Sequence, residues 1–293
     1  MNVENVSESN EYNGGVYIEE NKIKKESKEN TNKLICVLGT DARSKYLRKL
    51  YKDEGKNIVS YDNADVIIGP TPFSIDDIRV NGESLECDEL IKVLSDKRKT
   101  LYAGSLSNSM KEKFIRNNIN FYDLLDQKNV AFLNAIPTAE GAIKIAMEMT
   151  DFTIHGSNIL VLGYGKIGKI LSKMLKGIGA NVFCEARKKE DLAFIKAMGY
   201  NSIHIDKLDN YLNEMNIIFN TIPSMILDER RLQCLKPDCV VIDLASTPGG
   251  VDFLKAKELN INTTWALSLP TKVAPYTAAV YLKDTLDELL EKG

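Results

Sequence analysis

Three glycines in the middle of the chain have the spacing of a dinucleotide-binding loop. Gly163, Gly165 and Gly168 complete a G-x-G-x-x-G pattern after a predicted buried strand at residues 159–162, and apolar residues then recur at helical spacing. The residues between these glycines are Tyr164, Lys166 and Ile167. A strand, a glycine-rich turn and a helix in this order bring backbone N–H groups to a pyrophosphate. The pattern therefore predicts a dinucleotide site, and the plainer alternative is a tight turn that only packs the helix on the sheet.

The end of the next predicted strand favours NADP over NAD. The position that usually carries a ribose-binding carboxylate falls at Ala186, where no carboxylate would repel a 2′-phosphate. Arg187 and Lys188 follow and offer positive charge to that phosphate. A shift of one position would instead make Glu185 the ribose acid and favour NAD. The basic residues could also be solvated members of a loop.

Further coenzyme contacts are predicted where later strands end, because ligands of an open α/β sheet lie beyond the carboxyl ends of its strands. Segments 220–224, 243–250 and 267–275 follow three predicted strands and mix small, polar and proline residues. The predicted contacts in them are Asn220, Thr221, Ile222, Pro223, Leu244 and Ala245. Each segment could also be an ordinary loop between a strand and a helix.

Three residues outside these segments could bind or protonate a substrate. Arg43 could bind a carboxylate through two parallel hydrogen bonds, or form a surface ion pair with Asp41. His155 could act as a general base, although packing at a domain border is the favoured interpretation. Glu140 could face a cleft or pair with Lys144. With only two histidines in the chain, no metal site is predicted.

The elements that must position these residues alternate between strands and helices. In the first part, strands are predicted at residues 33–39, 58–61, 64–68, 100–103 and 130–133, and helices at 41–54 and 108–117. In the second part, strands are predicted at 159–162, 182–184, 202–205, 217–220, 240–244 and 263–266. This alternation predicts an α/β fold with two doubly wound, mostly parallel sheets. The first part lacks the later glycines of a fingerprint, so no dinucleotide is predicted there.

Two prolines mark the expected starts of helices. Pro137 should open a linking helix with Thr138 as its N-cap, and Pro275 should open a final helix that packs back on the first domain. In the first helix, Tyr46, Leu47 and Leu50 are expected to point inward. The expected division is a polar tail at 1–32, a first domain at 33–137 completed by 274–291, a link at 138–156 and a dinucleotide-binding domain at 157–273.

Bulk composition narrows the class of protein. The chain has 293 residues, enough for two domains, and a formal net charge of −3, which does not favour nucleic acid or an anionic membrane. No apolar run is expected to span a bilayer. Its five cysteines lack C-x-x-C spacing, which is typical of reduced structural thiols and a cytoplasmic location.

Six segments together resemble the family formed by the A subunits of dipicolinate synthase. They are residues 39–43, 134–141, 150–157, 220–227, 242–250 and 269–275, and the resemblance extends from about residue 33 to residue 290. The family pattern near the end of this resemblance reads G-L-P-G-x-x-A-P-x-T-A-G. This chain departs from it at its three glycines, which are replaced by Ser268, Thr271 and Ala279.

The resemblance implies two Rossmann-like domains with an interdomain cleft, as in D-2-hydroxyacid dehydrogenases. It implies NAD(P)-dependent oxidation of a small dicarboxylate, dihydrodipicolinate or its hydrated tetrahydro precursor, to dipicolinate. It further implies a flavoprotein-like B subunit of dipicolinate synthase as partner and the mother cell of a sporulating bacterium as the location. A homo-oligomer is a further expectation.

For this chemistry the residues divide into two groups. Contacts to the carboxylates and ring of the substrate are expected from Arg43, Asn134, Thr138 and Ser246, and proton handling from Glu140, His155 and Asp243. Two alternatives stay open. One is another NADP-dependent oxidoreductase of the shikimate or 2-hydroxyacid dehydrogenase type, and the other is a nucleotide-binding regulatory subunit without catalysis of its own.

Overall fold

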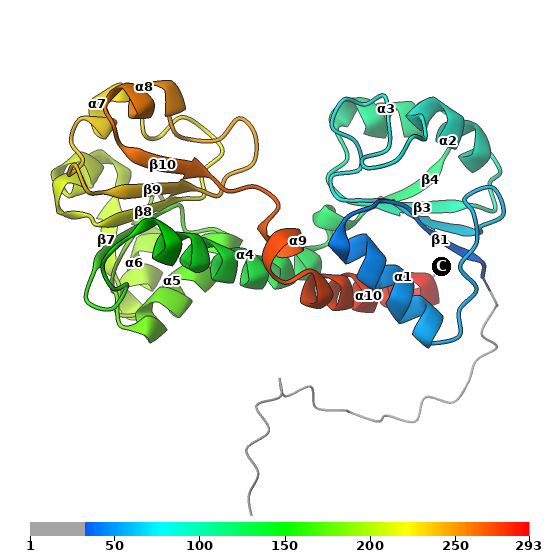
Figure 1. The fold of residues 1–293 in the computed structure, drawn as a ribbon, viewed down its shortest axis with the longest axis horizontal. Helices are drawn as coiled ribbons and strands as arrows, with labels where there is room; N and C mark the ends of the chain where they lie inside the picture. The colour runs from blue at the N-terminus through cyan, green and yellow to red at the C-terminus, as the bar shows by residue number, and fades with distance from the viewer. Residues whose placement is uncertain (1–32, 293) are drawn as a thin grey trace, which may run out of the picture. The chain divides into compact units, whose positions relative to one another are not determined.

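Two parallel β-sheets organise the chain (Figure 1). The computed structural model describes residues 33–292, so the tail predicted for residues 1–32 lies outside the described residues. One sheet has four strands in the order β1-β2-β3-β4, and the other has six in the order β10-β9-β8-β5-β6-β7. The expected α/β class with two parallel sheets is confirmed.

The first sheet contains one strand that the sequence does not predict and lacks two that it does, at residues 58–61 and 130–133. Its members are β1 (Ile35–Val37), β2 (Val66–Ile68), β3 (Thr100–Ala103) and β4 (Asn120–Asp123). The strand predicted at 58–61 is wrong, because only Ile58 pairs, with Ile35, before the chain turns at Ser60 to Asn63. This segment flanks the free edge of β1. Counting it, the order is 2-1-3-4-5, as in flavodoxin-like sheets.

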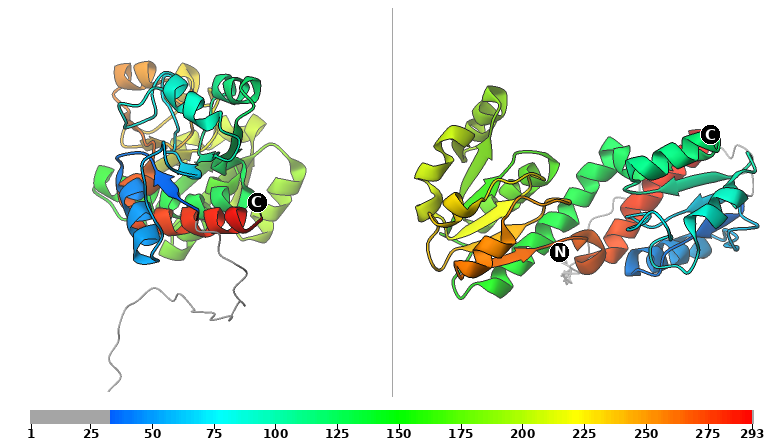
Figure 2. Two further views of the ribbon diagram at one scale, coloured as in Figure 1. Left: turned by 90° about the vertical axis from the view of Figure 1, so that its right-hand side faces the viewer. Right: turned by 90° about the horizontal axis from the view of Figure 1, so that it is seen from above.

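Helices cover both faces of this sheet (Figures 1 and 2). α1 (Ala42–Asp53) and α10 (Pro275–Lys292) lie on one face, and α2 (Cys87–Leu94) and α3 (Asn108–Arg116) on the other. Successive residues of a strand point to opposite faces, so Val37 packs with α1 and α10 while Cys36 packs on the opposite side. Pro275 begins α10, as predicted.

The sequence prediction is wrong for one inward residue of α1. Tyr46 is 39% exposed and packs edge-on against Tyr276, with 5.5 Å between ring centroids. Leu47 is buried, as predicted, and Tyr51 is buried with it, because residues four apart lie on the same face of a helix. Leu282 and Leu286 of α10 complete this core.

The linking helix is longer than the sequence predicts. α4 (Lys128–Met149) includes the predicted strand 130–133, and Pro137 lies inside it. Both the strand and the helix start at Pro137 are therefore wrong. Pro137 lacks only one N–H, and the Thr138 hydroxyl donates to the Asn134 carbonyl at 2.7 Å from within the helix rather than capping it.

The apolar character of α4 has a packing role. By length and composition, Asn129–Met149 could cross a membrane, contrary to expectation, but half of its most apolar window is buried inside the protein. Ala139, Ala142 and Ala146 are buried in a core to which the helix α5 (Lys166–Ile178) also contributes. α10 runs beside α4 (Figure 2), and Asn129 Nδ2 donates to Thr285 Oγ1 at 3.2 Å.

The second sheet has the strand order of a dinucleotide-binding fold. Its strands are β5 (Asn158–Leu162), β6 (Asn181–Ala186), β7 (Asn201–His204), β8 (Ile217–Asn220), β9 (Val240–Asp243) and β10 (Asn262–Trp265). All six predicted strands are thus confirmed, with ends shifted by a few residues. Read from β7, the order is 3-2-1-4-5-6, and the order in which strands are added to the sheet reverses between β5 and β8.

Helices again cover both faces of this sheet. One face carries α4, α5 (Lys166–Ile178) and α6 (Lys189–Ala197). The other carries α7 (Glu229–Leu232), α8 (Phe253–Glu258) and two short 3₁₀ turns, Ile205–Asn210 and Leu212–Glu214. The short helix α9 (Leu269–Val273) leads from β10 to α10. Both sheet faces are therefore buried, as continuous apolar strands predict.

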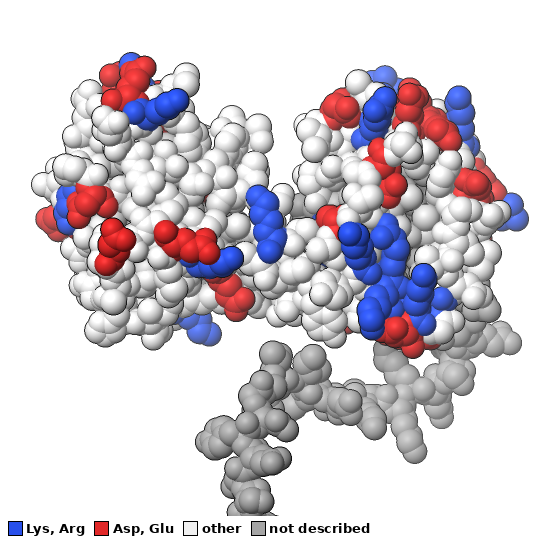
Figure 3. Space-filling view, viewed as in Figure 1, with Lys and Arg blue, Asp and Glu red and all other residues white. Residues whose placement is uncertain are grey.

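Charge is unevenly distributed on the surface. Figure 3 shows Lys and Arg side chains gathered over α1, where Lys45, Lys49 and Lys52 are exposed. Arg48 lies beside them and donates from Nε to the Val37 carbonyl at 2.9 Å. The small negative net charge of the whole chain therefore hides a local basic surface.

Candidate dinucleotide site

Two of the three fingerprint glycines are required by the fold itself. Gly163 has φ +88°, and a Cβ there would lie 2.6 Å from Thr221 Oγ1. A Cβ on Gly168 would lie 2.1 Å from the Gly163 carbonyl oxygen. Gly165 differs, because a Cβ there would have no neighbour within 4 Å. Nothing in the fold demands glycine at Gly165, which leaves close approach of a ligand as its physical reason.

The loop after β8 is bonded to the end of β5. Thr221 donates to the Leu162 carbonyl through both its backbone N–H and its hydroxyl, each at 2.9 Å. These loops border the point where the strand order reverses, which is where open α/β sheets bind ligands. Thr221 and Ile222, both predicted coenzyme contacts, therefore lie beside the glycine loop.

A buried carboxylate joins the loops that follow β8 and β9. Asp243 accepts from Asn220 Nδ2 at 2.8 Å, Ala245 N at 2.9 Å and Gly250 N at 2.8 Å. Asn220 also accepts from Ile222 N at 3.0 Å. Asp243 is fully buried and both of its oxygens are occupied, so the geometry suits positioning of the loops rather than proton transfer.

Trp265 extends this network to β10. Its Nε1 donates to the Ala245 carbonyl at 2.9 Å. Leu244 and Ala245 are buried, while Ser246 is exposed at the turn that Gly249 N closes by donating to the Ser246 carbonyl at 2.8 Å. The loop that follows β9 is thus held by hydrogen bonds to its backbone carbonyl groups, which the sequence pattern does not reveal.

Glu185 contacts the glycine loop directly. It is 1% exposed, and its Oε2 accepts from Gly163 N at 3.1 Å. Its Oε1 is the one buried side-chain nitrogen or oxygen without a hydrogen-bond partner in residues 33–292. Burial raises the pKa of this carboxyl, and the Gly163 N–H opposes that rise. Strand alternation could have indicated that Glu185 and Ala186 face opposite sides of β6.

The positions after β6 are open to solvent. Ala186 ends the strand and is buried, whereas Arg187 and Lys188 are exposed. Their charges are therefore free to meet an anion at the carboxyl end of β6.

The remaining fingerprint residues pack on α4 and α6. Tyr164 lies 6.3 Å from Phe194 between ring centroids, and burial raises the pKa of its hydroxyl to about 12. Lys166 begins α5, with Nζ 5.7 Å from the Phe132 ring centroid, and Ile167 is partly buried in the core. Lys166 therefore begins the helix whose N-terminus would face a pyrophosphate.

Arg43 lies in the first sheet's half of the chain and is not a surface residue. It is 6% exposed; its Nη2 donates to the Thr71 carbonyl at 3.0 Å and is 3.9 Å from Asp41 Oδ2. Burial lowers the pKa of its guanidinium, and Asp41 partly counteracts this. Asp41 mainly caps α1, accepting from Ser44 N at 2.7 Å. Of the two alternatives for Arg43, an exposed ion pair at the surface is wrong, because the guanidinium is buried, and the bond to Thr71 uses one of its five donors.

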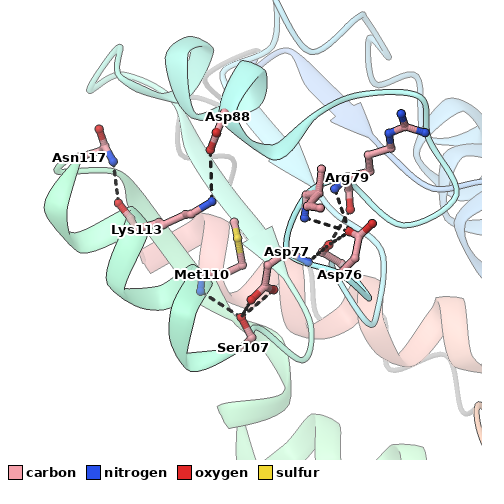
Figure 4. A network of polar contacts seen from close by, with 10 residues as sticks. Asp76, Asp77, Arg79, Asp88, Ser107, Met110, Lys113 and Asn117 are labelled. Carbon is pink, nitrogen blue, oxygen red and sulfur yellow. Dashed lines mark hydrogen bonds and ion pairs between the residues drawn. The ribbon is translucent and has the colours of Figure 1, made fainter.

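The loops after β2 and β3 are tied together near Arg43's end of the sheet (Figure 4). Asp76 Oδ1 accepts from Ile78 N at 2.9 Å and from Arg79 N at 3.0 Å. Ser107 Oγ donates to Asp77 at 2.8 Å and accepts from Met110 N at 3.0 Å, so it also caps α3. These contacts hold the loop that supplies Thr71.

The other predicted catalytic residues lie in different places. Asn134, Thr138 and Glu140 are all on α4, and Glu140 is exposed beside an apolar groove of about 600 Å³ between α4 and α5. Lys144 pairs with Glu148 at 3.5 Å rather than with Glu140. His155 is exposed just before β5 and contacts Gly179, at the amino edge of the sheet. That edge is opposite the glycine loop. Within residues 33–292, no cluster of metal-ligating side chains is present.

Comparison with known proteins agrees with this geometry. Residues 134–248 match the family described as D-isomer specific 2-hydroxyacid dehydrogenase, NAD binding domain. The A subunit of dipicolinate synthase from Bacillus subtilis (strain 168) is 36% identical over 220 residues, covering 75% of this chain and 72% of that protein. Three observations together support a nicotinamide coenzyme: the strand order, the open space beside Gly165 and this family match.

Solved structures show the same relationship. The A subunit of dipicolinate synthase from Bacillus halodurans has a TM-score of 0.82 and 29% identity, covering 89% of this chain and 98% of that one. The corresponding structure from Bacillus subtilis has a TM-score of 0.81 and 30% identity, covering 89% and 97%. Salmonella D-lactate dehydrogenase, at 14% identity, 89% and 97% coverage and a TM-score of 0.64, shares the fold.

Proposed function

The chain belongs to the family of dipicolinate synthase A subunits, and on that basis we propose that it oxidises dihydrodipicolinate, or its hydrated tetrahydro precursor, to dipicolinate. The single observation that carries the proposal is the glycine loop. Its two closely packed glycines and one open glycine fit a dinucleotide at the carboxyl end of β5. An oxidoreductase domain with a nicotinamide coenzyme follows from the family match to residues 134–248.

The chemistry makes modest demands on the protein. Converting a dihydropyridine dicarboxylate to a pyridine removes one hydride and one proton, and aromatisation supplies driving force. The coenzyme, when bound, supplies the hydride acceptor. The chain must hold the ring, neutralise two carboxylates and give the proton a route to solvent. The hydrated precursor would first have to lose water.

Arg43 is the proposed anchor for one substrate carboxylate. Its guanidinium is buried, and Asp41, the nearest carboxylate, is occupied as the cap of α1. A buried cation with spare donors gains most from a carboxylate that uses two of them. We assign Asn134, Thr138 and Ser246 to the remaining contacts and Glu140 to proton handling. We assign no such role to His155, because it lies at the amino edge of the sheet, opposite the glycine loop. Asp243 has none either, because both of its carboxylate oxygens accept hydrogen bonds within the protein.

The proposed coenzyme preference is NADP. Arg187 and Lys188 are exposed after β6, whereas the carboxylate that could repel a 2′-phosphate, Glu185, is buried and turned to Gly163. The competing preference for NAD would require Glu185 to accept from the ribose instead. The relative affinities of the two coenzymes distinguish these cases.

The proposal extends to domains, partner and location. The first sheet with α1–α3 and α10 would form the substrate domain, and the second sheet the coenzyme domain. Members of the family are the A subunits of a synthase, so the B subunit of that enzyme is the proposed partner. A second copy of this chain is proposed as a further partner. The proposed location is the cytoplasm of the mother cell of a sporulating bacterium.

The test is a coupled assay of nicotinamide absorbance with dihydrodipicolinate and NADP⁺. The chain should form dipicolinate and NADPH, alone or with the B subunit added. Turnover of a 2-hydroxy acid in place of dihydrodipicolinate would reassign the substrate. Turnover only when the B subunit is present, and unchanged when Arg43 is replaced, would indicate a regulatory role for this chain.

A further inference from the structure

The buried Glu185 carboxyl lies at the first glycine of the dinucleotide loop and lacks a full set of partners. Oε2 accepts from Gly163 N at 3.1 Å, and Oε1 has no partner. A buried carboxylate usually accepts several hydrogen bonds, because leaving its charge unpaired is costly. Glu185 has one, and its uncharged form therefore fits this position better than its ionised form.

The basic groups near Glu185 do not neutralise it. The charged groups facing it are Arg187 after its own strand, His204 at the end of β7 and Arg231 on α7. Arg231 is already bonded to Asp209 Oδ1 at 2.8 Å, and His204 Nδ1 is 3.2 Å from Asp206 Oδ2. Arg187 is exposed to solvent. None of the three forms a hydrogen bond with Glu185, and burial outweighs their combined effect.

We propose that Glu185 is a positioning residue that links coenzyme affinity to a proton. The dinucleotide binds the chain with Glu185 neutral, and binding to the ionised chain takes up one proton at this carboxyl. The inference rests on the coenzyme site proposed above. It concerns a residue that the fingerprint does not include and a property that the family match does not describe.

The physical cause is repulsion between like charges across the glycine loop. The later amides of the glycine loop would face a pyrophosphate in a dinucleotide site, whereas the Gly163 N–H faces Glu185 on the other side of the loop. A carboxylate and a pyrophosphate so placed repel each other strongly because little solvent separates them. Protonation removes the repulsion and leaves the Gly163 contact in place. Affinity should therefore fall as pH rises.

The experiment measures NAD⁺ binding by calorimetry from pH 5 to pH 9, in pairs of buffers with different ionisation enthalpies. NAD⁺ is the probe because it lacks the titrating 2′-phosphate of NADP⁺. Wild-type affinity should be constant at low pH and fall by up to about tenfold per pH unit above the pKa of Glu185, with uptake approaching one proton. Glu185→Gln should bind with constant affinity and no proton uptake.

Glu190→Gln is the matched control, since Glu190 is exposed on the first turn of α6. It should keep the wild-type pH dependence. If Glu185→Gln fails to fold, proton uptake by the wild type still decides the matter. Binding without proton uptake at any pH would overturn this inference alone. Absence of NAD⁺ and NADP⁺ binding at every pH would overturn the coenzyme site and this inference with it.

Discussion

Asn220 and Asp243 are hydrogen-bonded across the carboxyl ends of two neighbouring strands, with 2.8 Å between Nδ2 and Oδ1. Both residues are fully buried. Through Gly250 N and Ile222 N the pair also fixes the turns that follow each strand. The shape of the proposed coenzyme site therefore depends on one polar pair in an apolar interior.

Removing this carboxylate should destabilise the protein. Asp243→Ala leaves the N–H groups of Ala245 and Gly250 buried without acceptors, which should cost about 3 kcal/mol in free energy of unfolding. Urea denaturation followed by circular dichroism measures it. Asp238→Ala, at an exposed position before β9, is the control and should change stability little. Equal stability of the two variants would contradict the network.

Gly165→Val should abolish coenzyme binding without unfolding the chain. Open space surrounds the position, so the added side chain meets only a ligand. Titration of NADPH fluorescence should show at least about a hundredfold loss of affinity, the equivalent of about 2.7 kcal/mol, at an unchanged melting temperature.

Two other glycines serve as comparisons for Gly165. Gly168→Ala should lower the melting temperature, because its Cβ would lie 2.1 Å from the Gly163 oxygen. Gly177→Ala, at an open position within α5, should leave binding intact and favour the helix. Normal NADPH affinity in Gly165→Val would exclude the assigned site.

Arg187→Ala should weaken NADPH binding more than NADH binding. A guanidinium that contacts a 2′-phosphate contributes a charge-assisted hydrogen bond of about 1.5–3 kcal/mol, which NADH cannot make. The expected loss is thus about tenfold or more for NADPH and little for NADH. Lys196→Ala on the exposed side of α6 is the control. An equal loss for both coenzymes would argue against the proposed phosphate contact.

Arg43→Lys should raise KM for dihydrodipicolinate by about tenfold or more, because an ammonium cannot donate two parallel hydrogen bonds to a carboxylate. KM for the coenzyme should stay unchanged, since Arg43 belongs to the other sheet's half of the chain. Steady-state kinetics with each substrate varied in turn provides the test. Lys45→Arg, exposed on α1, is the control. An unchanged KM for the dicarboxylate would remove Arg43 from the substrate site.

Ser268→Gly should stabilise the chain. Ser268 has φ +60°, a left-handed conformation that costs an L-residue about 1 kcal/mol and glycine almost nothing. The melting temperature should rise in Ser268→Gly and not in Ser268→Ala, which keeps a Cβ. A rise in both variants would point to the hydroxyl group instead of the backbone.

The parts of the fold that the sequence predicts best are the buried parallel strands. Residues such as 217–220 form short apolar runs with turn signals on both sides, and burial on both faces of a sheet demands such runs. The glycine fingerprint is likewise local in the sequence, since the spacing of Gly163, Gly165 and Gly168 is enough to predict the turn between strand and helix. Both patterns can be recognised in a short segment without knowledge of the rest of the chain.

Elements whose conformation depends on distant neighbours are harder to predict. Val130 and Phe132 favour a strand by their intrinsic preferences, and Pro137 suggests a helix start, yet packing of α4 with α5 and α10 maintains one helix through all three. Ile58 looks like a strand residue but has a partner on one side only. Tertiary packing overrides local preference in each case.

The polar contacts of the site could not be predicted from spacing. Glycine counting locates the end of β6 correctly, but the Glu185 side chain reaches Gly163, 22 residues away, by the pairing of β5 with β6. The Asn220–Asp243 bond spans 23 residues in the same way. The register in which two strands pair decides such contacts. No short segment of the sequence indicates that register.

The return of α10 to the first sheet has a consequence for synthesis. Leu282 and Leu286 close the core that also contains Ile35 and Leu47, so a layer of the first sheet comes from residues that are translated after all strands of the second sheet. The second sheet is complete once β10 has emerged. During translation the later half is thus able to fold while the earlier half still waits for its final helix, in contrast to the usual order from the N-terminus.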